Sequence, residues 1–196
     1  MNRSLLAIIA VFSTIAPSVI PAQSASASSR TREIAALFSK HKHVVKEKRG
    51  VRTEKYKNVS AEPLIAANPT ILSGTYRAFD AHFVMQLSVS ADGIVKGSGT
   101  DLVDYDSRIS RSFTLVDGRV RGALLTAAKH YRDGKRESFE GVFMERTSFE
   151  SPQDPGTKAF GLGVLTRPMQ IGGNTIDRLF YERAAGEMAQ GNTGNR

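Results

Sequence analysis

Apolar and polar residues alternate along most of the chain, and this alternation limits the possible fold more than any other feature. Between Leu72 and about Ala184 the apolar period is 2, as in the series Phe83, Met85, Leu87. Such alternation is typical of antiparallel strands with one buried face. The strand candidates are 74–79, 82–90, 94–99, 109–115, 119–124, 137–146, 159–166 and 175–183. Because their connections are short, they predict a meander of about eight strands.

A repeated Asp-Gly motif predicts turns within this region. The stretch "ADGIVKG" (91–97) returns as "VDGRVRG" (116–122), and a third Asp-Gly pair lies at 133–134. Asp and Gly tolerate the positive φ of tight hairpin turns, so each pair predicts a turn. Glycines four residues further on, Gly97 and Gly122, are expected inside strands, where they permit a sheet to bend and close.

These patterns predict a mainly β fold: an antiparallel up-and-down meander of about eight strands, closed into a barrel and preceded by one amphipathic basic α-helix. Closure removes the exposed edges of an open sheet, and a two-sheet sandwich is the alternative. A barrel of this size either holds one small ligand or is filled by its own side chains. The candidate ligand-binding residues of the interior are Phe83, Met85, Leu87, Phe113, Leu115, Val120 and Leu124.

The stretch "SGTYRA" followed by "LSVSADGIVKGSG" resembles the opening strands of avidin-like and lipocalin-like barrels, the calycin type. The resemblance covers about thirty residues of the chain and implies a small antiparallel barrel. In avidin-like proteins tryptophans line the biotin site, and this chain has no tryptophan, so biotin binding does not carry over. Lipocalins commonly begin with Gly-x-Trp, and here Tyr76 stands in the place of that tryptophan.

The first 27 residues have the composition of a signal peptide. A short positive start at Arg3 precedes the apolar run "LLAIIAVF" and the small-x-small sequence Ala25-Ser26-Ala27, which predicts cleavage before Ser28. A retained membrane anchor is the competing interpretation, but polar residues interrupt the run early. The expected product is soluble and exported, to the periplasm or outside the cell, with a flexible tail at 185–196.

Positive charge is concentrated in the predicted arm at 28–71, a basic helix followed by a connector. Between Arg30 and Lys57 there are ten Lys or Arg and three Glu, whereas residues 58–196 have sixteen of each sign. Apolar residues at helical spacing from Ile34 to Val45 predict a helix over 31–50, with Thr31 as a possible cap. An anionic membrane surface, an acidic polysaccharide or a protein is the expected partner, and nucleic acid is less expected. The anionic-partner candidates are Lys40, Lys42, Lys46, Lys48, Arg49 and Arg52.

Motifs for catalysis and cofactor binding are missing from the sequence. There is no Gly-x-Ser-x-Gly elbow, no cysteine, no phosphate-binding loop and no dinucleotide fingerprint. The series Asp101, Asp104, Asp106 lacks the spacing of a calcium loop, so a solvated acidic loop beside Arg108 is expected. The histidines predict no metal site, and His82 and His130 are expected at partly exposed strand positions. No catalytic residue, metal or cofactor is therefore predicted.

Three functions remain open from the sequence. The barrel is a non-enzymatic binding module for a small apolar ligand, or its surface and arm bind a macromolecular partner. The third possibility is a small barrel enzyme, such as an isomerase acting on a hydrophobic substrate. The interior volume separates the first two, and a buried ionisable residue facing a cavity would favour the third. The oligomeric state is not predicted.

Overall fold

The computed structural model describes residues 28–48, 51–78, 82–104, 109–151, 153–171 and 174–184. For residues 42–48, 51–57, 103, 104 and 171 it describes the backbone alone. The predicted signal peptide at 1–27 and the predicted flexible tail at 185–196 lie outside the described residues. Within the described part, no helix has the length and apolar character needed to span a bilayer.

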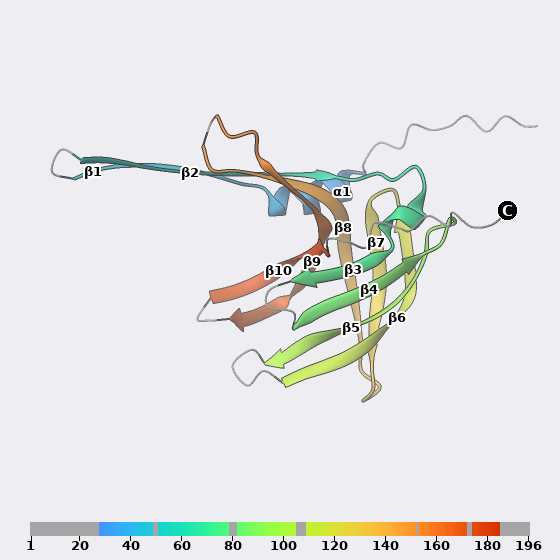
Figure 1. Ribbon diagram of the computed structural model, residues 1–196. Coiled ribbons are helices and arrows are strands. Elements are labelled where there is room, and N and C mark those ends of the chain that lie inside the picture. Colours follow the sequence, from blue (N-terminus) through green and yellow to red (C-terminus); the bar gives the residue numbers. More distant parts are fainter. Residues whose placement is uncertain are drawn as a thin grey trace, which may run out of the picture.

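Eight antiparallel strands form a closed barrel in up-and-down order (Figure 1). Each strand pairs with the next along the chain, β10 also pairs with β3, and the β8–β9 pairing completes the ring. The mainly β fold predicted from the alternation is therefore confirmed, and closure excludes the two-sheet sandwich. The strands are β3 (Gly74–Ala78), β4 (Phe83–Val89), β5 (Ile94–Asp104), β6 (Ile109–Arg121), β7 (Leu124–Tyr131), β8 (Arg136–Phe149), β9 (Thr157–Ile171) and β10 (Asn174–Arg183).

The barrel interior is a continuous apolar core, with Tyr76, Phe143 and Leu162 among its fully buried side chains. Six of the seven interior candidates belong to this core, and they are Phe83, Met85, Leu87, Phe113, Leu115 and Val120. Leu124 does not. It pairs with Arg121 across the β6–β7 turn and packs outside the barrel, while Leu125 takes the inward position. The prediction failed because the alternation was continued through a turn that changes which face a residue occupies.

Two of the three Asp-Gly pairs form the predicted turns. Gly93 and Gly134 adopt φ of 78° and 82° in the β4–β5 and β7–β8 turns. The predicted turn at Asp117-Gly118 is wrong. This pair lies within β6, where Asp117 has a φ of 53° and the register with β7 shifts between Val116 and Arg119, so it forms a β-bulge.

Gly97 lies inside β5 as predicted, whereas Gly122 lies in the turn between β6 and β7, so its predicted strand position is wrong. Gly99 shows why a glycine lies inside a strand. A Cβ atom at this position would come within 2.6 Å of Cζ of Phe113 and 2.2 Å of the Val84 carbonyl oxygen. The missing side chain therefore makes room for a phenylalanine ring in a narrow barrel.

One end of the barrel is closed by the short 3-10 helix η1 (Pro69–Leu72). Leu72 is fully buried in the core, and its carbonyl oxygen accepts a hydrogen bond of 2.6 Å from the Tyr76 hydroxyl. The Ser73 hydroxyl also accepts a hydrogen bond from the Val89 N–H at the end of β4. The opposite end, where β5 ends and β6 and β8 begin, is the mouth of the barrel.

Residues before the barrel form a short helix and a β-ribbon in place of the long helix predicted for 31–50. Helix α1 (Ser29–Phe38) is capped by Ser28, not by Thr31, and packs against the outside of the barrel through Ile34 and Phe38. Strands β1 (Lys40–Lys48) and β2 (Val51–Pro63) then pair as a hairpin that extends away from the barrel (Figure 1).

The edge of β8 explains why this segment becomes extended. β7 pairs with β8 only as far as Val142, and β2 continues along the same edge from Met144 to Phe149. An unpaired edge exposes backbone N–H and C=O groups, and β2 satisfies them. The single helix before the barrel is confirmed, but the connector predicted after it is largely strand.

Candidate functional site

Five polar residues lie at inward positions near the mouth of the barrel. Their strands are adjacent, because Asp101 is on β5, Arg111 on β6, Lys129 and Tyr131 on β7, and Glu137 on β8. Each of them lies on the same face of its strand as core residues. Lys129, for example, shares a face of β7 with Leu125, which lies four residues earlier. We call these five residues the mouth cluster.

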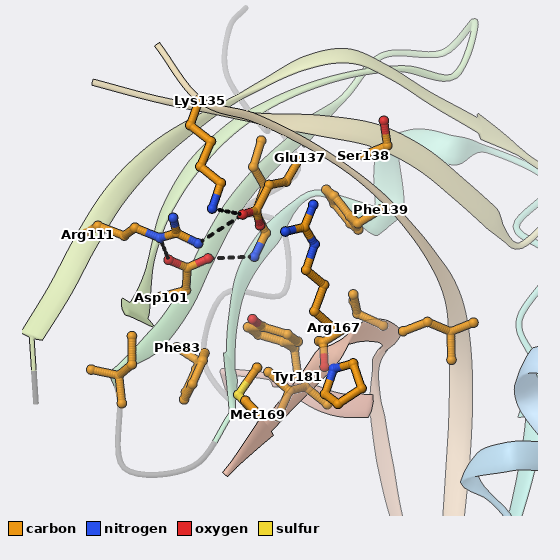
Figure 2. Close-up of a pocket in the computed structure, with 17 residues that line it drawn as sticks. Phe83, Asp101, Arg111, Lys135, Glu137, Ser138, Phe139, Arg167, Met169 and Tyr181 are labelled. Carbon is orange, nitrogen blue, oxygen red and sulfur yellow. Dashed lines mark hydrogen bonds and ion pairs between the residues drawn. The ribbon is translucent and has the colours of Figure 1, made fainter. Parts of the chain in front are cut away.

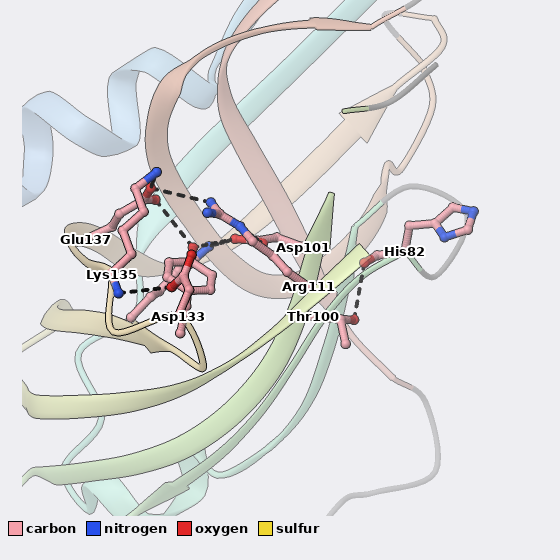
Figure 3. Close-up of polar contacts among 9 residues, drawn as sticks. His82, Thr100, Asp101, Arg111, Asp133, Lys135 and Glu137 are labelled. Atoms are coloured by element: carbon pink, nitrogen blue, oxygen red, sulfur yellow. Dashed lines mark hydrogen bonds and ion pairs between the residues drawn. The ribbon is translucent and has the colours of Figure 1, made fainter. Parts of the chain in front are cut away.

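Asp101 is at the centre of the mouth cluster (Figure 3). Its Oδ2 accepts hydrogen bonds from Lys129 Nζ at 2.9 Å and from the Tyr131 hydroxyl at 2.8 Å. Its Oδ1 accepts one from Arg111 Nε at 3.0 Å. Because the Asp101 side chain is only 8% exposed and that of Lys129 only 11%, both charges depend on these contacts for stability.

Glu137 extends the cluster toward solvent. One of its oxygens contacts Lys135 Nζ at 2.8 Å and Arg111 at 3.4 Å. The other lies 3.3 Å from the Tyr131 hydroxyl, whose single hydrogen is shared between this oxygen and the nearer Asp101. Burial would raise the pKa of Glu137, but the Lys135 hydrogen bond and the charges of Arg111, Lys135 and Arg167 outweigh it and lower that pKa. Burial, followed by the hydrogen bond to Asp101, raises the pKa of Tyr131, which therefore stays protonated and donates.

The cations of the cluster also contact aromatic rings. The Arg111 guanidinium lies 3.8 Å from the centroid of the Tyr131 ring, and Lys129 Nζ lies 4.6 Å from that of Phe113. Such contacts attract a cation to the face of an aromatic ring. They also connect the mouth cluster to the apolar core beneath it.

A pocket of about 240 Å³ opens beside the mouth cluster (Figure 2). Phe83, Phe139, Leu179 and Tyr181 supply apolar wall, and Asp101 and Glu137 supply its two carboxylates. Four cationic side chains line the same pocket, so positive charge is in excess: they are Arg111, Lys129, Lys135 and Arg167.

Arg167 differs from the other three cations because it has no acidic partner within ion-pair distance among the described residues. Figure 2 shows its side chain extending from β9 toward the mouth cluster with no dashed contact. A bulge places it there. Met169 pairs with Ile176 and Leu165 with Arg178, so three residues of β9 oppose one of β10, and Pro168 has no N–H for the ladder.

The predicted interior candidates contribute little to this pocket. Of the seven, only Phe83 lines it, and the others lie in the packed core or, for Leu124, outside it. Within the described residues the barrel interior is thus mostly filled by its own side chains, and the pocket of about 240 Å³ lies at its mouth.

The expectation of a solvated acidic loop is wrong for Asp101, which is buried in β5. For Asp104 the backbone alone is described, and Asp106 and Arg108 lie outside the described residues. His82 is half-buried and His130 is exposed, and the described residues contain no group of three or more His, Asp or Glu that could hold a metal ion.

The predicted basic arm is divided between the two strands of the ribbon. Lys40 is exposed at the start of β1, Lys42, Lys46 and Lys48 follow on β1, and Arg52 is on β2. Arg49 lies outside the described residues.

The mouth cluster was not predicted from the sequence, although one signal was present. Lys129 continues the alternation of Leu125 and Ala127, and Glu137 begins that of Phe139 and Gly141. Charged residues at inward strand positions require partners, so these two strands could have been predicted to meet at a polar layer.

Comparisons with protein-family models, with curated proteins and with solved structures found no match. The closed eight-stranded barrel is compatible with a calycin-like small barrel, and the resemblance goes no further than the architecture.

Proposed function

We propose that this protein is an exported, non-enzymatic binding protein that takes a small organic carboxylate into the pocket at the barrel mouth. The Arg167 guanidinium has no acidic group within ion-pair distance among the described residues, and it lines a pocket whose side chains include four cations and two carboxylates. This observation carries the proposal. A bound carboxylate would neutralise one of the two excess positive charges of this lining, and arginine presents two parallel donors to a carboxylate.

The apolar wall limits the rest of the ligand. Phe83, Phe139 and Leu179 favour a short aliphatic or aromatic group attached to the carboxylate. A volume of about 240 Å³ is below the usual range for drug-sized ligands, which favours a molecule of metabolite size. This proposal replaces the wholly apolar ligand in a hollow barrel, because core side chains occupy that space.

Export is part of the proposal and rests on residues 1–27, whose charge, apolar run and small-x-small site are those of a signal peptide. Secretion of the intact chain, with a mature N-terminus at Ser28 determined by mass spectrometry, tests it. A chain that keeps Met1 and stays inside the cell would contradict it.

A small barrel enzyme is the second candidate, favoured by buried ionisable residues that face the pocket, above all Asp101. The hydrogen bonds count against this role, because both Asp101 oxygens already accept donors from Lys129, Tyr131 and Arg111. A general base needs a free acceptor directed at the substrate.

Binding of benzoate and hexanoate, compared with their uncharged amides, tests the proposed ligand class. We expect chemical-shift changes in two-dimensional NMR spectra around Phe83, Phe139 and Tyr181, with the carboxylates binding more tightly than the amides. Arg167→Gln should weaken carboxylate binding by about tenfold or more, since a hydrogen bond to a charged group contributes that much.

Arg132→Gln is the matched control, because Arg132 is exposed at the β7–β8 turn and does not line this pocket. It should leave binding unchanged. Equal binding of acids and amides, or equal effects of the two variants, would contradict the proposal. Conversion of a bound compound during the titration, lost in Asp101→Asn, would favour the enzyme.

A further inference from the structure

The pairing of β1 with β2 sorts the charges of the ribbon between its two faces. Directly paired residues share a face, and neighbours along a strand alternate between faces. One face, which we call the lysine face, carries every lysine of the ribbon and no acidic residue. Its residues are Lys40, Lys42, Val44, Lys46 and Lys48 on β1, paired with Val59, Lys57, Lys55, Thr53 and Val51 on β2.

The opposite face has a different composition. It pairs His41 with Asn58, His43 with Tyr56, Val45 with Glu54 and Glu47 with Arg52. Glu47 of β1 and Glu54 of β2 therefore lie on this face, together with the two histidines and the tyrosine. The separation of charge is a property of the register, and it is not visible in the order of residues along the chain.

The lysines form an unbroken row along the ribbon. Each pair of residues on the lysine face contains at least one lysine. Val44 of β1 pairs with Lys55 of β2, and Lys42 pairs with a second lysine, Lys57. Alternate residues of an antiparallel strand are about 6.8 Å apart, so the row from Lys40 to Lys48 spans about 27 Å. This is a linear array of positive charge on a narrow support.

The ribbon is separate from the site at the barrel mouth. Figure 1 shows β1 and β2 running away from the barrel, and β2 joins β8 only from Asn58 onward. Helix α1 occupies the base of the lysine face, where Val59 is buried and the Ser39 hydroxyl accepts a hydrogen bond from the Ala61 N–H. Among the described strands, those parts of β1 and β2 pair only with each other.

From this arrangement we propose that the lysine face binds a linear acidic polysaccharide along the length of the ribbon. A single row of cations fits an extended polymer with regularly spaced carboxylates, and the attraction needs no exact register between them. The proposal does not depend on the carboxylate pocket, since the two sites share no residue.

Two other polyanions fit this face less well. A membrane-binding surface combines cations with Trp, Phe or Leu that enter the bilayer, whereas Val44, Val51, Thr53 and Val59 are the uncharged residues here. Single-stranded nucleic acid binds through aromatic stacking as well as charge, and the one aromatic residue of the ribbon, Tyr56, is on the other face. The cations of the lysine face are all lysines. A lysine ammonium attracts an anion as a point charge, whereas the bidentate recognition of phosphate is typical of arginine.

The test compares binding of a size-defined polygalacturonate oligomer to the intact protein and to two triple variants. Lys42→Ser/Lys46→Ser/Lys55→Ser removes three charges from the lysine face. Lys96→Ser/Arg119→Ser/Arg121→Ser removes three exposed charges from the barrel surface and is the matched control. Circular dichroism and thermal melting of each variant show that it is folded.

The lysine-face variant should bind about 100-fold more weakly at low salt, since each lysine near an anionic surface contributes roughly fivefold. The control variant should keep most of the affinity, and binding by the intact protein should weaken as salt rises. Equal losses in the two variants would show that net charge alone is responsible and would overturn the proposal.

The same titration with single-stranded DNA and with phosphatidylglycerol vesicles tests the choice of partner. Polygalacturonate should bind more tightly than either at equal salt. Tighter binding to DNA or to vesicles, or no binding of polygalacturonate by the intact protein, would overturn the assignment to a polysaccharide.

Discussion

Replacing Asp101 by Asn should destabilise the fold strongly, because it removes the only carboxylate that contacts Lys129 among the described residues. Asn has nearly the same shape as Asp and keeps one acceptor oxygen, so packing is little changed. The ammonium of Lys129, with a side chain 11% exposed, is then left without a counter-charge. Removing one partner of a buried ion pair costs about 3–5 kcal/mol.

Urea denaturation and thermal melting measure this loss. For a chain of this size each kcal/mol lowers the melting temperature by about 2–4 °C, so we expect a decrease of roughly 6–20 °C. The urea midpoint should fall while the slope of the unfolding curve stays constant, because the surface exposed on unfolding does not change.

Asp117→Asn is the matched control. Asp117 also forms an ion pair, with Arg136, but both side chains are more than half exposed, and such pairs contribute about 0–1 kcal/mol. Asn tolerates the positive φ of this position, so the backbone is not strained.

A double-mutant cycle shows whether the loss comes from the ion pair itself. Lys129→Met removes the charge and keeps an apolar chain near Phe113 and Phe139. Asp101→Asn/Lys129→Met should then be more stable than the sum of the two single changes, by about 0.5–3 kcal/mol. A loss in Asp101→Asn no larger than in Asp117→Asn, or strictly additive effects in the cycle, would refute the reasoning.

Three further changes test other parts of the barrel. Gly99→Ala should destabilise by about 1–3 kcal/mol through overpacking, and more than Gly122→Ala, where no atom lies within 4 Å of the added Cβ and only the φ of 62° is strained. Leu125→Ala should cost about 2–5 kcal/mol as a core truncation, and more than Leu124→Ala on the outer surface. Glu137, whose pKa is lowered in the fold, should stabilise above about pH 4.3, and this contribution should disappear as the pH falls through its folded pKa.

Urea denaturation measures all three. For Glu137 the comparison is with Glu137→Gln at pH 7 and at pH 3, and the difference in stability between the two chains should shrink at the lower pH. A difference that grows on acidification would mean that Glu137 is better stabilised in its protonated form. Equal losses for Leu124→Ala and Leu125→Ala would contradict the inward position of Leu125, and a tolerated Gly99→Ala would contradict the close contact with Phe113.

The alternation along single strands predicted the barrel core well because it reports a local property, the face on which each side chain lies. It placed Phe83, Phe113 and Leu115 in the interior. It failed at Leu124, because the β6–β7 turn changes which residues of the alternation face inward. It also failed at Asp117-Gly118, where a β-bulge adds a residue to β6 without ending the strand.

Long-range pairing accounts for the other failures. The segment from Lys40 to Lys48 has apolar spacing that suits a helix, and it becomes a strand because β2 is held on the edge of β8, more than eighty residues away in the sequence. The mouth cluster likewise requires β5 to β8 to align so that Asp101 meets Lys129. Neither alignment can be read from a short stretch of sequence.

The mouth cluster makes one substitution informative about stability and binding together. Asp101 neutralises part of the positive charge in the pocket, so Asp101→Asn raises the net charge that a carboxylate ligand experiences. The variant should therefore be less stable and yet bind benzoate more tightly, measured well below its melting temperature. Asp101 would then stabilise the fold while weakening ligand binding, and such a trade-off between stability and function is typical of functional sites. If folded Asp101→Asn binds benzoate more weakly, the positive charge of the pocket does not drive binding, and the assignment of Arg167 as the anion-binding group would be wrong.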